Sequence, residues 1–134
     1  MTRLGVEVSK INAKVKGAVA EREVRDILLK YLLPSGDPVQ AKRGCQHSGG
    51  ADSPDVAHNI PNLHIEVKRC EKMNPAKARD ALGQAQRDAG DNNLPVVVWR
   101  SNRTEYVAML SFRHLLNLLG CEECNQQSKG KIDE

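Results

Sequence analysis

Aromatic residues are scarce in this chain: its 134 residues include one Trp, two Tyr and one Phe, 3% of the total. Proteins that hold single-stranded nucleic acid by base stacking usually carry more, so this scarcity favours recognition of backbone and shape. Long hydrophobic runs are also missing, and a membrane span needs about 18 or more apolar residues in a row. The first residues, MTRLGVEVSKINAK, lack the apolar core of a signal peptide. We therefore expect a cytoplasmic protein without a membrane partner.

Cysteine is too sparse for a disulfide scaffold, since four cysteines do not make one in a chain of this length. Cys121 and Cys124 form a CEEC motif, which is half of a zinc site. The other ligands would have to come from Cys45, Cys70, a histidine or a second subunit. We expect a reduced pair in a flexible C-terminal tail, residues 121–134, with zinc as the open alternative.

The length of the chain is typical of one domain, which we place at residues 1–120. Charge is distributed unevenly along this domain. Residues 1–50 hold nine Lys and Arg against five Asp and Glu, whereas residues 51–120 hold nine against eight. A basic first third favours a polyanionic partner, with a merely solvated surface as the alternative.

Hydrophobic spacing and turn residues divide the chain into helices and strands. The clearest helix start is Asn74-Pro75, a capping residue followed by a proline in the first helical position. The expected elements, in chain order, are a helix at 9–33, strands at 39–43, 54–57 and 63–69, a helix at 75–89, strands at 94–100 and 104–110, and a helix at 111–120. This order, α-β-β-β-α-β-β-α, predicts an α/β fold with a mixed central sheet flanked by helices.

The third expected strand, LHIEVKR at residues 63–69, carries charged residues in an otherwise apolar run. Alternate residues of a strand share a face, so its three apolar side chains should point toward the core. The opposite face then carries three polar side chains: His64, Glu66 and Lys68. Asp55 lies at the neighbouring short strand, ten intervening residues before Glu66, and a hairpin would bring the two carboxyl groups together.

Two adjacent carboxylates repel each other and are difficult to ionise together unless a cation lies between them. Oxygen ligands of this kind suit Mg²⁺ or Mn²⁺, which keep open positions for water and phosphate. Lys68 on the same face could hold an attacking water and offset charge at a reacting phosphate. The alternative is an exposed sheet face with a weak Glu–Lys pair, and a structural role for His64.

The spacing of Asp55 from Glu-Val-Lys resembles the signature of the PD-(D/E)xK nuclease superfamily, Pro-Asp followed by Glu-x-Lys. The resemblance implies a restriction-endonuclease-like core. It also implies that Asp55 and Glu66 bind a metal ion, with the carbonyl of Val67 as a further ligand. Lys68 would assist the attacking water.

Three further segments resemble the Holliday-junction resolvases within that superfamily. KGAVAEREVRDILLKYL, residues 16–32, resembles the first helix of the archaeal-type enzymes, and their helix glutamate falls on Glu21. HSGGADSPD resembles the approach to their catalytic aspartate, with the active-site serine at Ser48. ALGQAQRDAGDNNLPVVVWRSNR is similar to the next helix and strand of phage-type members, whose active-site glutamine matches Gln84 better than Gln86.

These likenesses imply a phage-type, Mg²⁺-dependent endonuclease that acts as a homodimer on four-way DNA junctions, in DNA recombination and DNA repair. A flap or single-strand nuclease of the virus-type replication–repair group is one alternative. A DNA-binding module that has lost catalysis is another. Basic residues near the expected site are candidate phosphate contacts: Lys14, Lys16, Arg22, Lys42, Arg43, Arg69 and Lys72.

Overall fold

A computed structural model of the protein describes residues 17–44 and 55–124. Three of the predicted site residues, Lys14, Lys16 and Ser48, lie outside these ranges, as do Cys45 and most of the expected C-terminal tail. The described part of the first helix covers residues 17–28. The other elements are β1 (Ala41–Arg43), β2 (Val56–His58), β3 (Leu63–Arg69), α2 (Pro75–Ala89), β4 (Leu94–Arg100), β5 (Val107–Met109) and α3 (Phe112–Leu118).

The order of these elements is the predicted one, and the α/β class with a mixed sheet flanked by helices is confirmed. β3, α2 and β4 have the predicted bounds. The caps are also as expected, because Asn74 accepts a hydrogen bond from the amide of Lys77 and Ser111 accepts one from His114. β1 and β5 are shorter than predicted, three residues each.

The strands form two sheets, and this differs from the predicted hairpin between the second and third strands. β3 pairs in parallel with β4, and β4 pairs antiparallel with β5. β2 pairs antiparallel with β1, so the expected β2–β3 ladder is wrong. β3 is consequently an edge strand of its sheet, which leaves its outer edge available to side chains.

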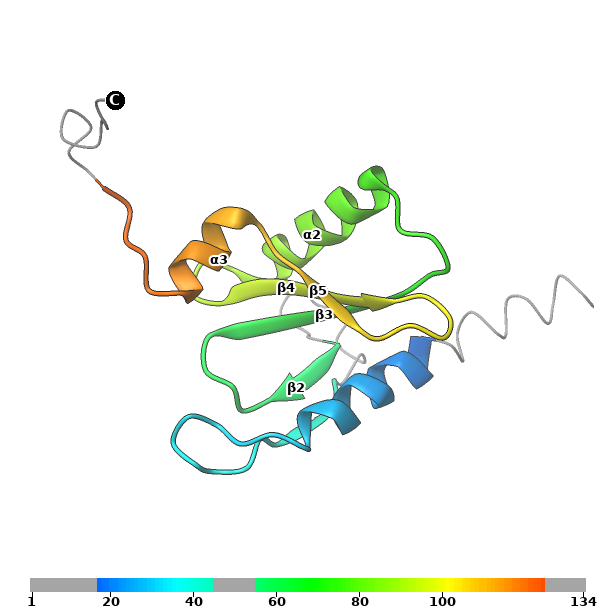
Figure 1. Ribbon diagram of the computed structural model, residues 1–134, viewed down its shortest axis with the longest axis horizontal. Helices are drawn as coiled ribbons and strands as arrows, with labels where there is room; N and C mark the ends of the chain where they lie inside the picture. Colours follow the sequence, from blue (N-terminus) through cyan, green and yellow to red (C-terminus); the bar gives the residue numbers. More distant parts are fainter. Residues whose placement is uncertain (1–16, 45–54, 125–134) are drawn as a thin grey trace, which may run out of the picture.

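The first helix and α2 lie on opposite sides of the strands, as Figure 1 shows. On the side of the first helix, Val24 packs with Val56 and Ile65 in one core cluster. On the other side, Ala81 and Ala85 of α2 pack with Val97 of β4 in a second cluster. A parallel pair such as β3–β4 requires a crossover, and α2 provides it. In the described part of the chain, every helix is too short or too polar to span a bilayer.

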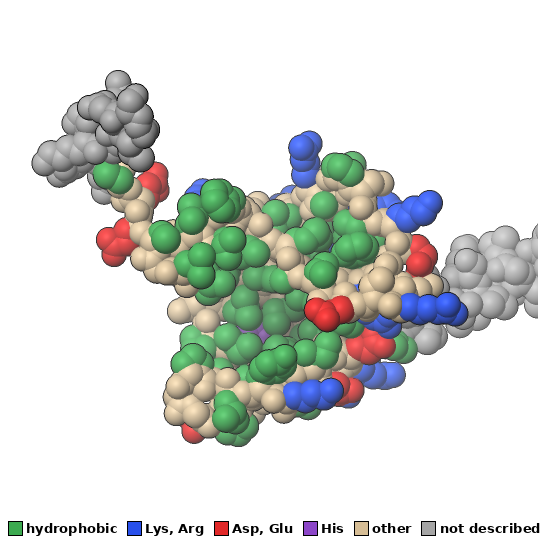
Figure 2. Space-filling view, in the orientation of Figure 1, with side chains coloured by type: hydrophobic (Ala, Val, Ile, Leu, Met, Phe, Trp, Pro, Cys, Tyr) green, Lys and Arg blue, Asp and Glu red, His purple; other side chains and the backbone are tan. Residues whose placement is uncertain are grey.

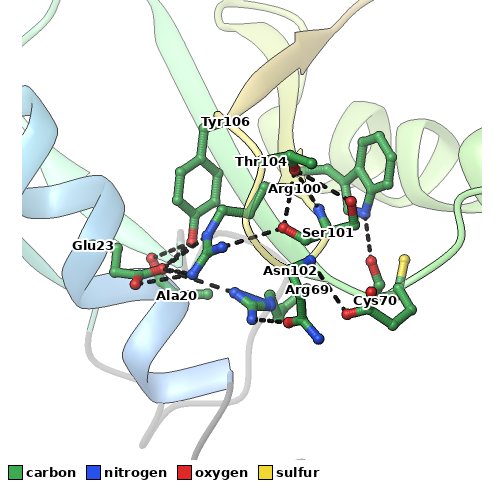
Figure 3. A network of polar contacts seen from close by, with 11 residues as sticks. Ala20, Glu23, Arg69, Cys70, Arg100, Ser101, Asn102, Thr104 and Tyr106 are labelled. Carbon is green, nitrogen blue, oxygen red and sulfur yellow. Dashed lines mark hydrogen bonds and ion pairs between the residues drawn. The ribbon is translucent and has the colours of Figure 1, made fainter.

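A polar network centred on Glu23 joins the first helix to the ends of β3, β4 and the loop before β5 (Figure 3). The carboxylate of Glu23 accepts hydrogen bonds from the hydroxyl of Tyr106 at 2.7 Å and from Arg100 Nη2 at 3.1 Å. Arg69 Nη1 lies 4.0 Å from the same carboxylate, and its Nη2 donates to Asn102. The guanidinium of Arg100 also lies 5.3 Å from the centre of the Tyr106 ring. This network holds the helix against the sheet with charge-assisted hydrogen bonds.

Candidate active site

The polar face of β3 turns toward α2 and is largely covered by it. His64 and Glu66 are only 5% and 4% exposed, so the alternative of an exposed sheet face is wrong for both. The alternation of side chains along β3 was predicted, but the packing of α2 over its polar face was not. The two-residue period of a strand determines which side chains share a face, and it does not determine what packs on that face. Burial of the Glu66 carboxylate is energetically costly, since a charge removed from water needs a compensating partner.

Lys68 continues this face toward solvent, with 35% of its side chain exposed. Its ammonium donates a hydrogen bond to Gln84 Oε1 on α2 at 3.3 Å and lies 4.0 Å from Glu66 Oε2. Gln84 therefore faces the site, whereas the second choice, Gln86, is exposed. The structure brings Glu66, Lys68 and Gln84 together, as the sequence predicted.

Asp55 reaches the free edge of β3 from the start of β2. Its Oδ2 accepts a hydrogen bond from the backbone N–H of Val67 at 2.8 Å, which satisfies an edge amide of the strand. Burial, opposed by that hydrogen bond, and the nearby charges of Glu66 and Glu21 together raise the pKa of Asp55 to about 7. The two predicted metal-binding carboxyl groups thus meet without the predicted hairpin.

Glu66 has neighbours on both sides. Its Oε1 lies 3.5 Å from His64 Nε2, and its Oε2 faces Lys68. Burial acts to raise the pKa of Glu66, but the contacts from His64 and Asp55 and the charge of Lys68 outweigh it and lower that pKa. Asp55 and Glu66 are therefore shifted in opposite directions, and one proton can be shared between them.

Glu21 is buried on the first helix, and its Oε1 accepts a hydrogen bond from Arg43 Nε at 2.9 Å. Its charge contributes to the raised pKa of Asp55, which places it in the same electrostatic neighbourhood. Three carboxyl groups from three segments, Glu21, Asp55 and Glu66, therefore converge at this edge of β3.

The candidate phosphate contacts divide into two groups. Arg22, Lys42 and Lys72 are exposed. Arg43 pairs with Glu21 instead, and Arg69 is held in the Glu23 network with its side chain 13% exposed. A hollow of about 270 Å³ lies beside the end of β3. Its lining includes the cationic and polar side chains of Lys68, Arg69, Lys77 and Gln84. Lys77 was not predicted, because it lies well after the signature motif.

Sequence reasoning also missed Asp88. It follows Gln84 by four residues and so lies on the same face of α2. His64, Glu66 and Asp88 each offer a ligand atom, and these atoms all lie within 4.8 Å of one another, so the three side chains could hold a metal ion. The helical spacing from Gln84 was the signal that could have identified it.

The CEEC motif gives no comparable arrangement. Cys121 and Cys124 are both exposed, and neither belongs to the group of metal-binding side chains found among the described residues. Comparisons with protein-family models, curated proteins and solved structures found no match to this chain.

Proposed function

We propose that the protein is a metal-dependent endonuclease that hydrolyses DNA phosphodiester bonds, with Mg²⁺ as its ion and Mn²⁺ as a substitute. The observation that carries the proposal is the convergence of Asp55 and Glu66 beside Lys68, with Gln84 holding the ammonium. Two carboxyl groups that repel each other next to a fixed cation are costly for a merely structural site. The resemblance of this segment to the PD-(D/E)xK signature supports the same conclusion.

The residues present suit a hard divalent ion. Asp55 accepts the Val67 amide through Oδ2 and lies within side-chain hydrogen-bond reach of Glu66, so a cation that replaced the proton between the two carboxyl groups would have both as ligands. We assign these two side chains and the carbonyl of Val67 as protein ligands. A bound Mg²⁺ would polarise the phosphate and make a coordinated water more acidic.

Lys68 has a separate task in this proposal. Its ammonium, held by Gln84, positions the attacking water and offsets the negative charge that builds on the phosphate oxygens. As the water oxygen bonds to phosphorus, the water gives up one proton to the solvent. The bond from phosphorus to one sugar oxygen breaks, and the departing oxygen takes up one proton from the solvent, so the protons balance. Glu21 orients water at the edge of the site, while Ser48 remains a predicted participant outside the described residues.

DNA would approach over the hollow lined by Lys68 and Lys77, with Lys72 at its margin, while Arg69 stays paired with Glu23. These cations would bind phosphates and tolerate many sequences. We propose four-way junctions as the substrate, on the resemblance to resolvases, and a two-fold dimer to match their two symmetric strands. Exposed apolar side chains at the two ends of α3 support self-association, since Phe112, Leu118 and the C-cap residue Leu119 are each more than 60% exposed. Figure 2 shows apolar side chains gathered over α3.

The decisive experiment uses labelled junctions, flaps and linear duplex, with Mg²⁺ and then with EDTA. Asp55→Asn should abolish cleavage while DNA binding stays intact or becomes tighter, because a negative charge near the phosphates is removed. Asp91→Asn, an exposed aspartate in the turn after α2, is the matched control and should cleave normally. Near-normal cleavage by Asp55→Asn would remove the assignment of the active site.

The choice of substrate is tested by the same assay. A resolvase should cut junctions in symmetric pairs, run as a dimer in sizing experiments and resist competition by linear duplex at moderate salt. A monomer that cuts flaps or single strands equally well would exclude the resolvase assignment and leave the nuclease assignment intact. DNA binding without any cleavage would identify a non-catalytic module.

A further inference from the structure

The face of β3 that turns toward α2 contains a second group of potential ligands, which shares Glu66 with the site at Asp55. His64 and Glu66 come from β3, and Asp88 comes from α2. At the other end of this face, Lys68 contacts Gln84, one helical turn before Asp88. The two ends therefore present different chemistry, an ammonium with an amide at one and an imidazole with two carboxylates at the other.

His64 is the unusual member of this group. Its side chain is only 5% exposed, yet Nε2 has no hydrogen-bond partner among the described residues. The nearest oxygen, Glu66 Oε1, lies 3.5 Å away. A buried polar atom without a partner costs about 1–3 kcal/mol, so natural proteins seldom retain one without a use. A cation held between this nitrogen and the nearby carboxylate would supply the missing partner.

The distances suit a small ion. Two ligand atoms, each about 2.1 Å from a tetrahedral zinc ion, lie about 3.4 Å apart. The 3.5 Å between His64 and Glu66 already matches this separation. Asp88, within 4.8 Å of both, would complete three protein ligands by a small adjustment of its side chain. Asp88 is half-buried, so this adjustment is open to it.

An open side is also available for water or another ligand. His64 and Asp88 line a cavity of about 430 Å³, together with His58, Asn62 and Asn93. His58 Nδ1 accepts a hydrogen bond from the amide of Ile60 at 3.0 Å, so that nitrogen is already occupied and His58 lines the cavity without joining the three ligands. Three protein ligands beside a polar cavity is the arrangement of zinc sites that keep an exchangeable position.

We propose that His64, Glu66 and Asp88 form a site for a transition-metal ion of the Zn²⁺ class, in addition to the Mg²⁺ site at Asp55. The imidazole determines the class, because nitrogen ligands favour zinc, cobalt and nickel over magnesium and calcium. Glu66 is common to both sites, since its two oxygens face opposite ways. The inference does not depend on nuclease activity, because its three ligands can bind an ion in a protein of any function.

The test uses the full chain after treatment with a chelator, and titrates it with Zn²⁺, with Co²⁺ as a spectroscopic probe, and with Mg²⁺ for comparison. We expect one tight Zn²⁺ site. Mutating a residue that only hydrogen-bonds to a metal ligand lowers metal affinity about 10–100-fold. Removing a ligand itself should cost more, so His64→Ala should weaken Zn²⁺ binding at least about 100-fold. Asp88→Asn, a substitution of equal size on a half-buried helix position, should weaken it as well and keeps the test valid if His64→Ala does not fold.

The controls separate this site from two others. Asp80→Asn removes an exposed aspartate two turns earlier on α2 and should bind Zn²⁺ normally. Co²⁺ bound to Cys121 and Cys124 would give an intense thiolate charge-transfer band, which the proposed site lacks. Asp55→Asn should keep Zn²⁺ binding even as it loses cleavage, so the two proposals can fail separately. Zn²⁺ affinity that is unchanged in both His64→Ala and Asp88→Asn, or a thiolate band, would overturn the inference.

Discussion

Glu23 and Asp55 are both partly buried carboxyl groups close to β3, yet their surroundings have opposite effects. Glu23 is surrounded by donors, and the hydrogen bond from Tyr106, aided by Arg100 and Arg69 against burial, lowers its pKa. Burial raises the pKa of Asp55 to about 7, with one backbone donor opposing the shift and two acidic neighbours adding to it. The first arrangement stabilises the fold as it stands. The second becomes stable only when a proton or a cation joins it, which is the behaviour of a binding site.

The largest expected effect concerns Lys68, which lies beside Glu66 in the Asp55 region. Lys68→Ala should lower the single-turnover cleavage rate about 100-fold or more, about 3 kcal/mol, because Lys68 acts in the transition state. Lys77→Ala removes the same charge from the same hollow and should weaken binding without this loss of rate. If the Lys68 variant loses only affinity, Lys68 is an ordinary phosphate contact.

The next effect tests the structural region. Glu23→Ala should lower the free energy of unfolding by about 2 kcal/mol, because it leaves Tyr106 and Arg100 without their acceptor. Chemical denaturation measures this directly. Asp26→Asn, which removes an exposed carboxylate of the same helix that pairs with its neighbour Arg25, should change stability by less than about 0.5 kcal/mol. Equal free energies of unfolding for the two variants would contradict a stabilising role for Glu23.

The smallest effect is a pH dependence of the metal-free protein. A carboxyl whose pKa is raised on folding, here from 3.8 to about 7, stabilises the fold at low pH and loses that contribution as pH rises through 7. Asp55→Asn cannot ionise, so relative to wild type its stability should increase between about pH 4 and 7. The gain should be about 1 kcal/mol, because Asp55 is partly exposed and Glu66 is shifted the opposite way. A constant difference between the two proteins would contradict the raised pKa.

Local signals in the sequence were enough for much of this arrangement. The alternation in LHIEVKR predicted which side chains would share a face of β3, and the capping residue Asn74 predicted where α2 begins. Gln84 was named from the resemblance to phage-type resolvases, and its contact with Lys68 joins these two regular elements.

Other features depend on contacts between distant segments. Arg100 and Glu23 are 77 residues apart in the sequence, so no local pattern predicts their contact. The contact of Arg69 with the same carboxylate has no local signal either, and the sequence suggested only a phosphate contact for that residue. The pairing of β2 with β1 is of the same kind, since a short strand with a loop on either side can pair with more than one neighbour. The burial of His64 also depends on how closely a helix packs above it.

That closeness comes from the alanines of α2. Ala81, Ala85 and Ala89 are buried, and their methyl groups let the helix approach the sheet more nearly than leucines would. Small side chains also bury little apolar area, so each contributes less to holding the helix than a larger residue would. The attachment of α2 therefore depends to an unusual degree on its polar contacts with β3. An ion or a substrate that strengthens those contacts would also tighten the helix on the sheet, so that occupancy and local stability rise together.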